Sequence, residues 1–116
     1  MDTPTKPNPA EQRREPRIQI AEQVQVRDAN SGRILGQLVN LSSEGLMLVG
    51  ADCVAPGTIY QLTIPLETTP DADPLLLGAE SLWCSDANHS GFYWSGFQII
   101  DISPEHRQVL ARIVGS

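Results

Sequence analysis

The sequence predicts a small, mainly β protein: a six-stranded antiparallel β-barrel with one C-terminal α-helix. Three observations lead to this fold class. Short segments alternate apolar and polar residues, nine glycines and nine prolines supply many turns in 116 residues, and a helical period appears only near the end. The length fits a single domain. We therefore expect the barrel to span residues 18–102 and the helix residues 104–114.

The N-terminal segment differs in composition from the rest. Residues 1–12 hold three prolines among polar residues, which predicts a disordered tail. The next five residues read R-R-E-P-R, and Pro16 disfavours a helix through Glu15. We expect residues 13–17 to be an extended arm that leads into the barrel, so the folded domain would cover residues 13–116.

Alternating polarity predicts the strands in turn. The first two form a hairpin across the turn D-A-N-S-G at 28–32, and Glu22 interrupts the pattern of the first. The apolar run from Leu46 to Val49 is typical of a strand covered on both faces. The six expected strands cover residues 18–26, 33–41, 46–49, 59–66, 75–84 and 92–100.

The closing helix has a clear start signal. Ser103 is a suitable N-cap, Pro104 fits the first helical position, and Glu105 places an acid in the first turn. One apolar stripe follows at helical spacing, formed by Val109, Leu110, Ile113 and Val114. This stripe predicts that the helix packs on the barrel.

Net charge limits the classes of partner. A formal charge of −6 and a pI of about 4.7 disfavour a broad DNA or anionic membrane surface, so we expect neither DNA binding nor membrane insertion. The first residues lack the pattern of a secretory signal, and no apolar run is long enough for a span. The expected location is the cytoplasm.

The two cysteines, Cys53 and Cys84, are far apart in the sequence and have apolar or aromatic neighbours. In a reducing compartment they are most simply small buried residues. A disulfide or a metal site is disfavoured, because there is no C-x-x-C pair and neither histidine is spaced as a ligand.

Three of the seven arginines lie close together at Arg13, Arg14 and Arg17. Each guanidinium group carries a permanent charge and paired donors that match phosphate oxygens or the O6/N7 edge of guanine. The alternative is an ordinary solvated surface, with these arginines paired to nearby glutamates.

A second polar feature interrupts an apolar strand at Asn40, Ser42 and Gly45. Asn40 and Ser42 stand two residues apart, so on an extended strand both would face the same way and could bind one flat group. Gly45 allows a positive φ or a close backbone approach. The alternative is a turn, since these residue types commonly end strands.

Together the two features resemble the PilZ domain, a bacterial receptor module for the second messenger cyclic di-GMP. The family signature is R-x-x-x-R on an N-terminal arm, followed by [D/N]-x-S-x-x-G. Residues 13–17 fit the first element and residues 40–45 fit the second. The resemblance extends over residues 11–114, implies a six-stranded barrel with a C-terminal helix, and includes the last strand, S-G-F-Q-I at 95–99.

The resemblance implies a role for each matching residue. Arg13 and Arg17 would grip phosphate and guanine with help from Arg14, while Asn40 and Ser42 would bind a guanine edge or a phosphate, with Gly45 shaping the turn. Asn40 stands where many members have Asp and lacks the charge that strengthens a bond to guanine. One nucleotide or an intercalated pair would fit this arrangement.

Trp83 lies in the fifth expected strand, where the family often has an aromatic residue. It is either a core residue, the interpretation we slightly favour, or a platform on which guanine stacks.

The function implied is that of a monomeric cyclic di-GMP receptor that needs no cofactor. Its arm would close over the nucleotide and create a surface for a downstream protein. The alternative is an adaptor that uses a PilZ-like barrel for protein contacts without binding nucleotide. An enzyme is disfavoured, because Ser42 has no histidine nearby in the sequence and the acids show no paired spacing.

Overall fold

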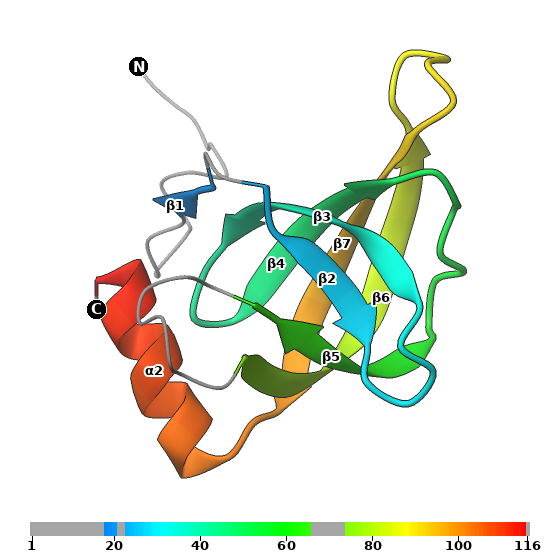
Figure 1. The fold of residues 1–116 in the computed structure, drawn as a ribbon. Coiled ribbons are helices and arrows are strands. Elements are labelled where there is room, and N and C mark those ends of the chain that lie inside the picture. The colour runs from blue at the N-terminus through cyan, green and yellow to red at the C-terminus, as the bar shows by residue number, and fades with distance from the viewer. Residues whose placement is uncertain (1–17, 21–22, 66–73, 116) are drawn as a thin grey trace, which may run out of the picture.

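The computed structural model describes residues 18–20, 23–65 and 74–115, which form an antiparallel β-barrel with one helix beside it (Figure 1). Six strands close the barrel in the order β3-β2-β5-β6-β7-β4, with β4 returning to β3, and β1 adds to the free part of the β3 edge. The strands are β1 (Ile18–Gln19), β2 (Gln25–Asp28), β3 (Ile34–Leu41), β4 (Gly45–Gly50), β5 (Ile59–Ile64), β6 (Leu75–Asp86) and β7 (Tyr93–Asp101). The predicted fold class is therefore confirmed.

The first predicted strand, 18–26, is wrong in one respect, because the structure divides it into β1 and β2. Both pieces pair with β3. Ile20 donates its N–H to Val39 O (2.9 Å), while Leu38 donates to Val24 O (2.8 Å). Val39 and Leu38 are neighbours in β3, whereas Ile20 and Val24 are four positions apart in the sequence, so β1 and β2 cannot continue one another along β3.

Alternation decides which residues enter the core. In β5, Leu62 and Ile64 are fully buried. In β4, Leu46 and Leu48 are buried whereas Met47 and Val49 are only half-buried, so the expectation of a strand covered on both faces is wrong. β4 is a wall of the barrel with one inner and one outer face. The core also includes Val24, Val26, Leu38, Leu41, Val54, Leu75, Leu77, Ala79, Phe97, Ile99, Leu110 and Val114.

Helix α2 (Pro104–Val114) has the predicted bounds. The Ser103 side chain accepts a hydrogen bond from the His106 N–H, and Gly115 ends the helix in the left-handed conformation, with φ 79°. Leu110 and Val114 enter the core, and His106 Nδ1 accepts a hydrogen bond from the Leu76 N–H at 3.1 Å. The helix is thus joined to the start of β6 by both apolar packing and a side-chain hydrogen bond.

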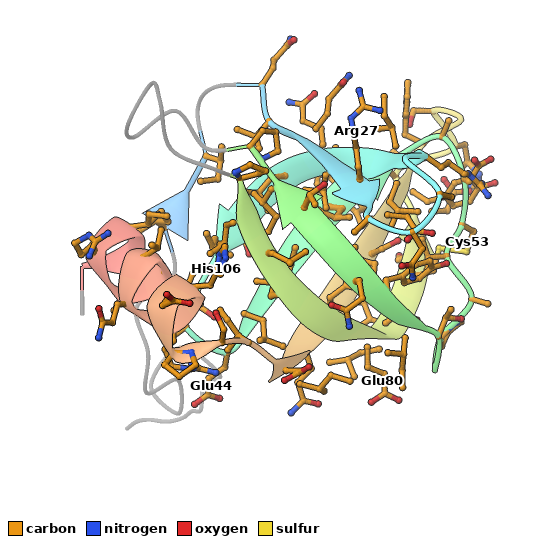
Figure 2. All side chains as sticks on the ribbon, turned by 60° about the horizontal axis from the view of Figure 1, so that its bottom comes forward. Arg27, Glu44, Cys53, Glu80 and His106 are labelled. Atoms are coloured by element: carbon orange, nitrogen blue, oxygen red, sulfur yellow. A yellow bond between two sulfur atoms is a disulfide. The ribbon has the colours of Figure 1, made fainter. Side chains whose placement is uncertain are left out.

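Residues 51–58 form a segment that closes the end of the barrel remote from α2 (Figures 1 and 2). Val54 enters the core, and the buried Ser81 hydroxyl accepts from Thr58 N–H (3.0 Å) and donates to Ala55 O (2.6 Å). Buried hydrogen bonds of this kind hold a connection in one conformation. The segment is therefore anchored to β6.

The same anchoring brings Cys53 to Cys84, and the two are joined in a disulfide with Cα atoms 5.9 Å apart. The expectation of two small, buried, unlinked cysteines is wrong: Cys53 is exposed and Cys84 is half-buried. Their sequence separation of 31 residues gave no sign of the contact, which arises from the way the segment 51–58 crosses the barrel end.

Candidate functional site

The turn between β3 and β4 carries the second predicted motif. Ser42 is fully buried, and its hydroxyl oxygen accepts from Gly45 N–H (3.1 Å) and Glu44 N–H (3.3 Å). β3 ends at Leu41, so Ser42 lies in the turn rather than on an extended strand. Ser42 also donates its N–H to Gly45 O (2.9 Å), so the pairing between the two strands continues to this residue, and its hydroxyl stabilises the turn.

Gly45 begins β4 and pairs with Gln98 of β7. It is absent from the glycines with a positive φ in the described chain, so the left-handed conformation is not the reason for a glycine at this position. The turn is held from two further sides: Ile99 donates its N–H to Glu44 O (2.9 Å), and Arg107 Nη1 of α2 donates to Ser43 O (3.3 Å). The motif is thus fixed to β7 and to the helix.

Asn40 lies near the end of β3, after an irregularity in the pairing between Leu38 and Asn40. It is 8% exposed and pairs with Met47, whose side chain lies on the outer face of β4. Asn40 Nδ2 lies 4.0 Å from Met47 Sδ, within reach of a weak hydrogen bond to sulfur. The amide therefore belongs to the outer face of the barrel.

A row of paired residues extends from Asn40 around this outer face. Asn40 pairs with Met47, Met47 with Gly96 of β7, and Gly96 with Trp83 of β6. We call these four residues the outer row. A Cβ added to Gly96 would lie 2.3 Å from Trp83 Nε1 and 2.4 Å from its Cε2, so the indole lies directly over the glycine.

Trp83 is 41% exposed, so our preference for a core position is wrong. The physical reason is a β-bulge between Ser81 and Trp83. Ser81 pairs with the buried Phe97, but the extra residue Leu82 moves Trp83 opposite Gly96, on the outer face. A regular strand would have kept both odd-numbered residues inside.

A second tryptophan, which the sequence analysis did not single out, lies next to this row. Trp94 pairs with Val49 on one side and Ser85 on the other, so it is a diagonal neighbour of Trp83 on the same face. Its position two residues before Gly96 was the available signal, since residues two apart on a strand share a face. Arg107 was also missed, because nothing in the sequence indicates that its helix approaches the turn.

The outer row presents the exposed Trp83 indole, and the buried Asn40 amide lies at the other end of the row. A purine ring can stack on an indole, while an amide can bind a base edge or a phosphate. The residues predicted to supply positive charge, Arg13, Arg14 and Arg17, lie outside the described residues. The structure therefore brings together Asn40 and Trp83 in one row, with Ser42 and Gly45 in the adjoining turn.

The described residues contain neither a candidate metal site nor a membrane-spanning helix. They contain no group of three or more His, Cys, Asp or Glu side chains arranged to hold a metal ion. The two histidines are engaged elsewhere: His106 binds the Leu76 N–H, and His89 lies 3.3 Å from Asp86 in the β6–β7 hairpin. Within the same ranges, no helix combines the length and apolar character needed to cross a bilayer.

The fold and the surface together define a small antiparallel barrel with a candidate ligand face on its outside. The PilZ domain family model matches residues 11–116, so the chain belongs to the PilZ domain family.

Several solved PilZ structures share the fold. The PilZ domain of YcgR from Escherichia coli, solved with c-di-GMP, matches with a TM-score of 0.67 at 16% identity, over 89% of this chain and 88% of that one. YcgR from the same organism, in complex with c-di-GMP, matches with a TM-score of 0.69 at 20% identity, over 89% and 44%.

The inhibitor of motility MotI (DgrA) of Bacillus subtilis also matches, with a TM-score of 0.69 at 18% identity over 88% of this chain. The present chain spans about half of MotI, with 48% of that protein covered. No curated protein sequence matches the chain.

Proposed function

We propose that this protein is a receptor for cyclic di-GMP, which binds on the outer face of the barrel beside the β3–β4 turn. Membership of the PilZ family and the cyclic di-GMP held by the two YcgR structures support this ligand class. The observation that carries the proposal is the outer row, in which the Asn40 amide and the Trp83 indole lie on one face with only Met47 and Gly96 between them.

The outer row would bind the base, and the arginine arm would supply the charge. One guanine stacks on the Trp83 indole, while Asn40 binds a base edge or a phosphate oxygen. Because the chain carries a formal charge of −6, the phosphates need a local cation cluster, which Arg13, Arg14 and Arg17 would provide. These arginines close over the nucleotide in the proposed complex.

Asn40 and Ser42 are both buried in the structure. Asn40 is 8% exposed and Ser42 has no exposed surface, so a ligand reaches Asn40 only after the surface above it opens. Ser42 then acts chiefly by holding the turn in place. Opening and re-closing would couple ligand binding to a change of surface, which a downstream protein could read. In this proposal the protein works in the cytoplasm as a monomeric binding protein, not as an enzyme.

Isothermal titration of the full chain with cyclic di-GMP tests the proposal. We expect saturable binding, and no heat at high micromolar nucleotide would reject it in favour of a PilZ-like adaptor that uses the barrel only for protein contacts. Arg17→Ala removes a charge-assisted hydrogen bond worth about 1.5–3 kcal/mol, so the Kd should rise roughly 10- to 150-fold.

Arg33→Ala is the matched arginine control. Arg33 is exposed, pairs with Asp52 at 3.0 Å and precedes β3, whereas Asn40 lies near the opposite end of that strand. The control should bind like the parent. Equal Kd values for Arg17→Ala and the parent would show that the arm is not part of the site.

A further inference from the structure

The disulfide joins the segment 51–58 to strand β6. Cys53 belongs to the segment 51–58, and Cys84 lies near the end of β6, 31 residues further on. Their Cα separation of 5.9 Å is within the ordinary range for a disulfide, so closing the bond requires no large backbone movement. These are the only two cysteines of the chain, so neither has a competing partner within it.

The bond is placed where a thiol reagent can reach it. Cys53 is exposed and Cys84 is half-buried, and the pair lies at the end of the barrel remote from α2 (Figure 2). Thiol–disulfide exchange requires a thiolate to approach a sulfur, so accessibility decides whether a disulfide can be opened in the folded protein. Buried structural disulfides lack this access.

Cys84 is also the direct neighbour of Trp83. The bulge that turns Trp83 outward begins at Ser81, so it is held on one side by the Ser81 hydrogen bonds to the segment 51–58 and on the other by the disulfide. In the adjacent strand, Cys84 pairs with Ser95, beside Gly96. The covalent link therefore secures the stretch of β6 that aims the indole at its place over Gly96.

We propose that Cys53 and Cys84 form a reversible redox modification site, oxidised by a low-molecular-weight disulfide, and that the oxidised form binds the nucleotide more tightly. The second part rests on the proposed function. One thiolate attacks oxidised glutathione, forms a mixed disulfide and releases one glutathione. The other cysteine attacks that mixed disulfide, closes the Cys53–Cys84 bond and releases the second glutathione. The protein loses two electrons, which the glutathione disulfide gains.

The direction of the coupling follows from preorganisation. With the bond closed, the bulge is held between two anchors and the indole stays over Gly96. With the bond open, the segment 51–58 keeps only its hydrogen bonds and apolar contact, so part of the binding free energy must be used to order Trp83. Reduction should therefore weaken binding.

Two measurements on the folded full chain test the proposal. The first follows alkylation of the thiols by mass after equilibration in glutathione buffers of graded ratio, without denaturant. We expect complete and reversible interconversion. Thiols that react only after unfolding would overturn the redox site.

The second measurement compares the Kd for cyclic di-GMP of the oxidised and the reduced chain. The reduced form should bind at least about threefold more weakly. Cys53→Ser should have the same Kd as the reduced parent, and this Kd should not change when reductant is added. The variant therefore separates an effect of the bond from an effect of the reagent. Equal Kd values for the two forms would overturn the coupling.

A third measurement distinguishes a failure of the proposed nucleotide binding from a failure of the proposed effect of the disulfide. If neither form binds nucleotide, the receptor function fails, and the effect of the disulfide on Trp83 is measured by fluorescence in a Trp94→Phe background, where Trp83 is the only indole. Reduction should then shift the Trp83 emission to longer wavelength as the indole leaves Gly96. An unchanged emission maximum would show that the disulfide does not position Trp83 and would overturn this part of the proposal.

Discussion

Replacing Gly96 with alanine should remove the Trp83 indole from its place on the barrel. The added Cβ would lie 2.3 Å from Nε1, 2.4 Å from Cε2 and 2.8 Å from Cζ2 of Trp83, closer than non-bonded carbon atoms approach each other. The backbone of β7 is paired on both sides, with β4 and with β6, so the side chain is the part that must move. The indole should swing outward while the barrel stays folded.

The magnitude follows from the value of the stacking contact. Stacking of a base on an aromatic side chain is worth about 1–3 kcal/mol, so the Kd for cyclic di-GMP should rise roughly 5- to 150-fold in Gly96→Ala. Isothermal titration measures this change. Gly78→Ala is a suitable control, because Gly78 also lies in the sheet and its added Cβ would lie 3.0 Å from the end of the Gln61 side chain, away from the outer row.

A double-mutant cycle makes the test specific to the indole. Once Trp83 is replaced by alanine, the methyl group at position 96 has nothing to displace, so adding Gly96→Ala should change the Kd little further. If Gly96→Ala weakened binding equally with and without Trp83, the effect would come from the β7 backbone. If it left both the Kd and the tryptophan emission unchanged, the reasoning about the outer row would be refuted.

Three further predictions concern stability, each read as a free energy of unfolding from urea titration. Cys53→Ser should cost about 3.7 kcal/mol, since the chain-entropy model for a loop of 31 residues gives this value; an unchanged urea midpoint would mean that the disulfide does not constrain the unfolded chain. Ser81→Ala should cost about 1–3 kcal/mol, because Thr58 N–H and Ala55 O lose a buried partner; a neutral result would show that the segment 51–58 is held by other contacts. Ser103→Ala should cost about 1 kcal/mol through loss of the N-cap, whereas Ser103→Asp, which keeps an acceptor, should cost less, and equal losses would exclude a capping effect.

Most of the strands and the helix could be predicted from the sequence, because alternating polarity and helix-capping residues depend only on neighbouring positions in the chain. The period of two depends on successive side chains, and it predicted strands at residues 33–41 and 59–66, where β3 and β5 lie. The bounds of the helix were predicted correctly, because the N-cap Ser103 and the following Pro104 mark its first residue. The division of the first strand into β1 and β2 was not predicted, because it depends on which β3 residues the two pieces meet.

The candidate site was only partly predictable. The order and spacing of the two motifs indicated the PilZ family, which the family model confirms over residues 11–116. The role of Ser42 in the turn was not predicted, since its hydroxyl holds the turn by accepting from Glu44 N–H and Gly45 N–H. A residue type can indicate a hydrogen-bonding role, but not which of several nearby donors it will meet.

The sequence by itself determined the fold class, the strand and helix periods, and the two motifs that indicate the family, because each depends on residues close together in the chain. Only the tertiary structure decided that Trp83 faces outward over Gly96 and that Cys53 reaches Cys84. The reason is that one extra residue in a bulge reverses the inside and outside of a strand, and barrel closure joins segments that no local pattern relates.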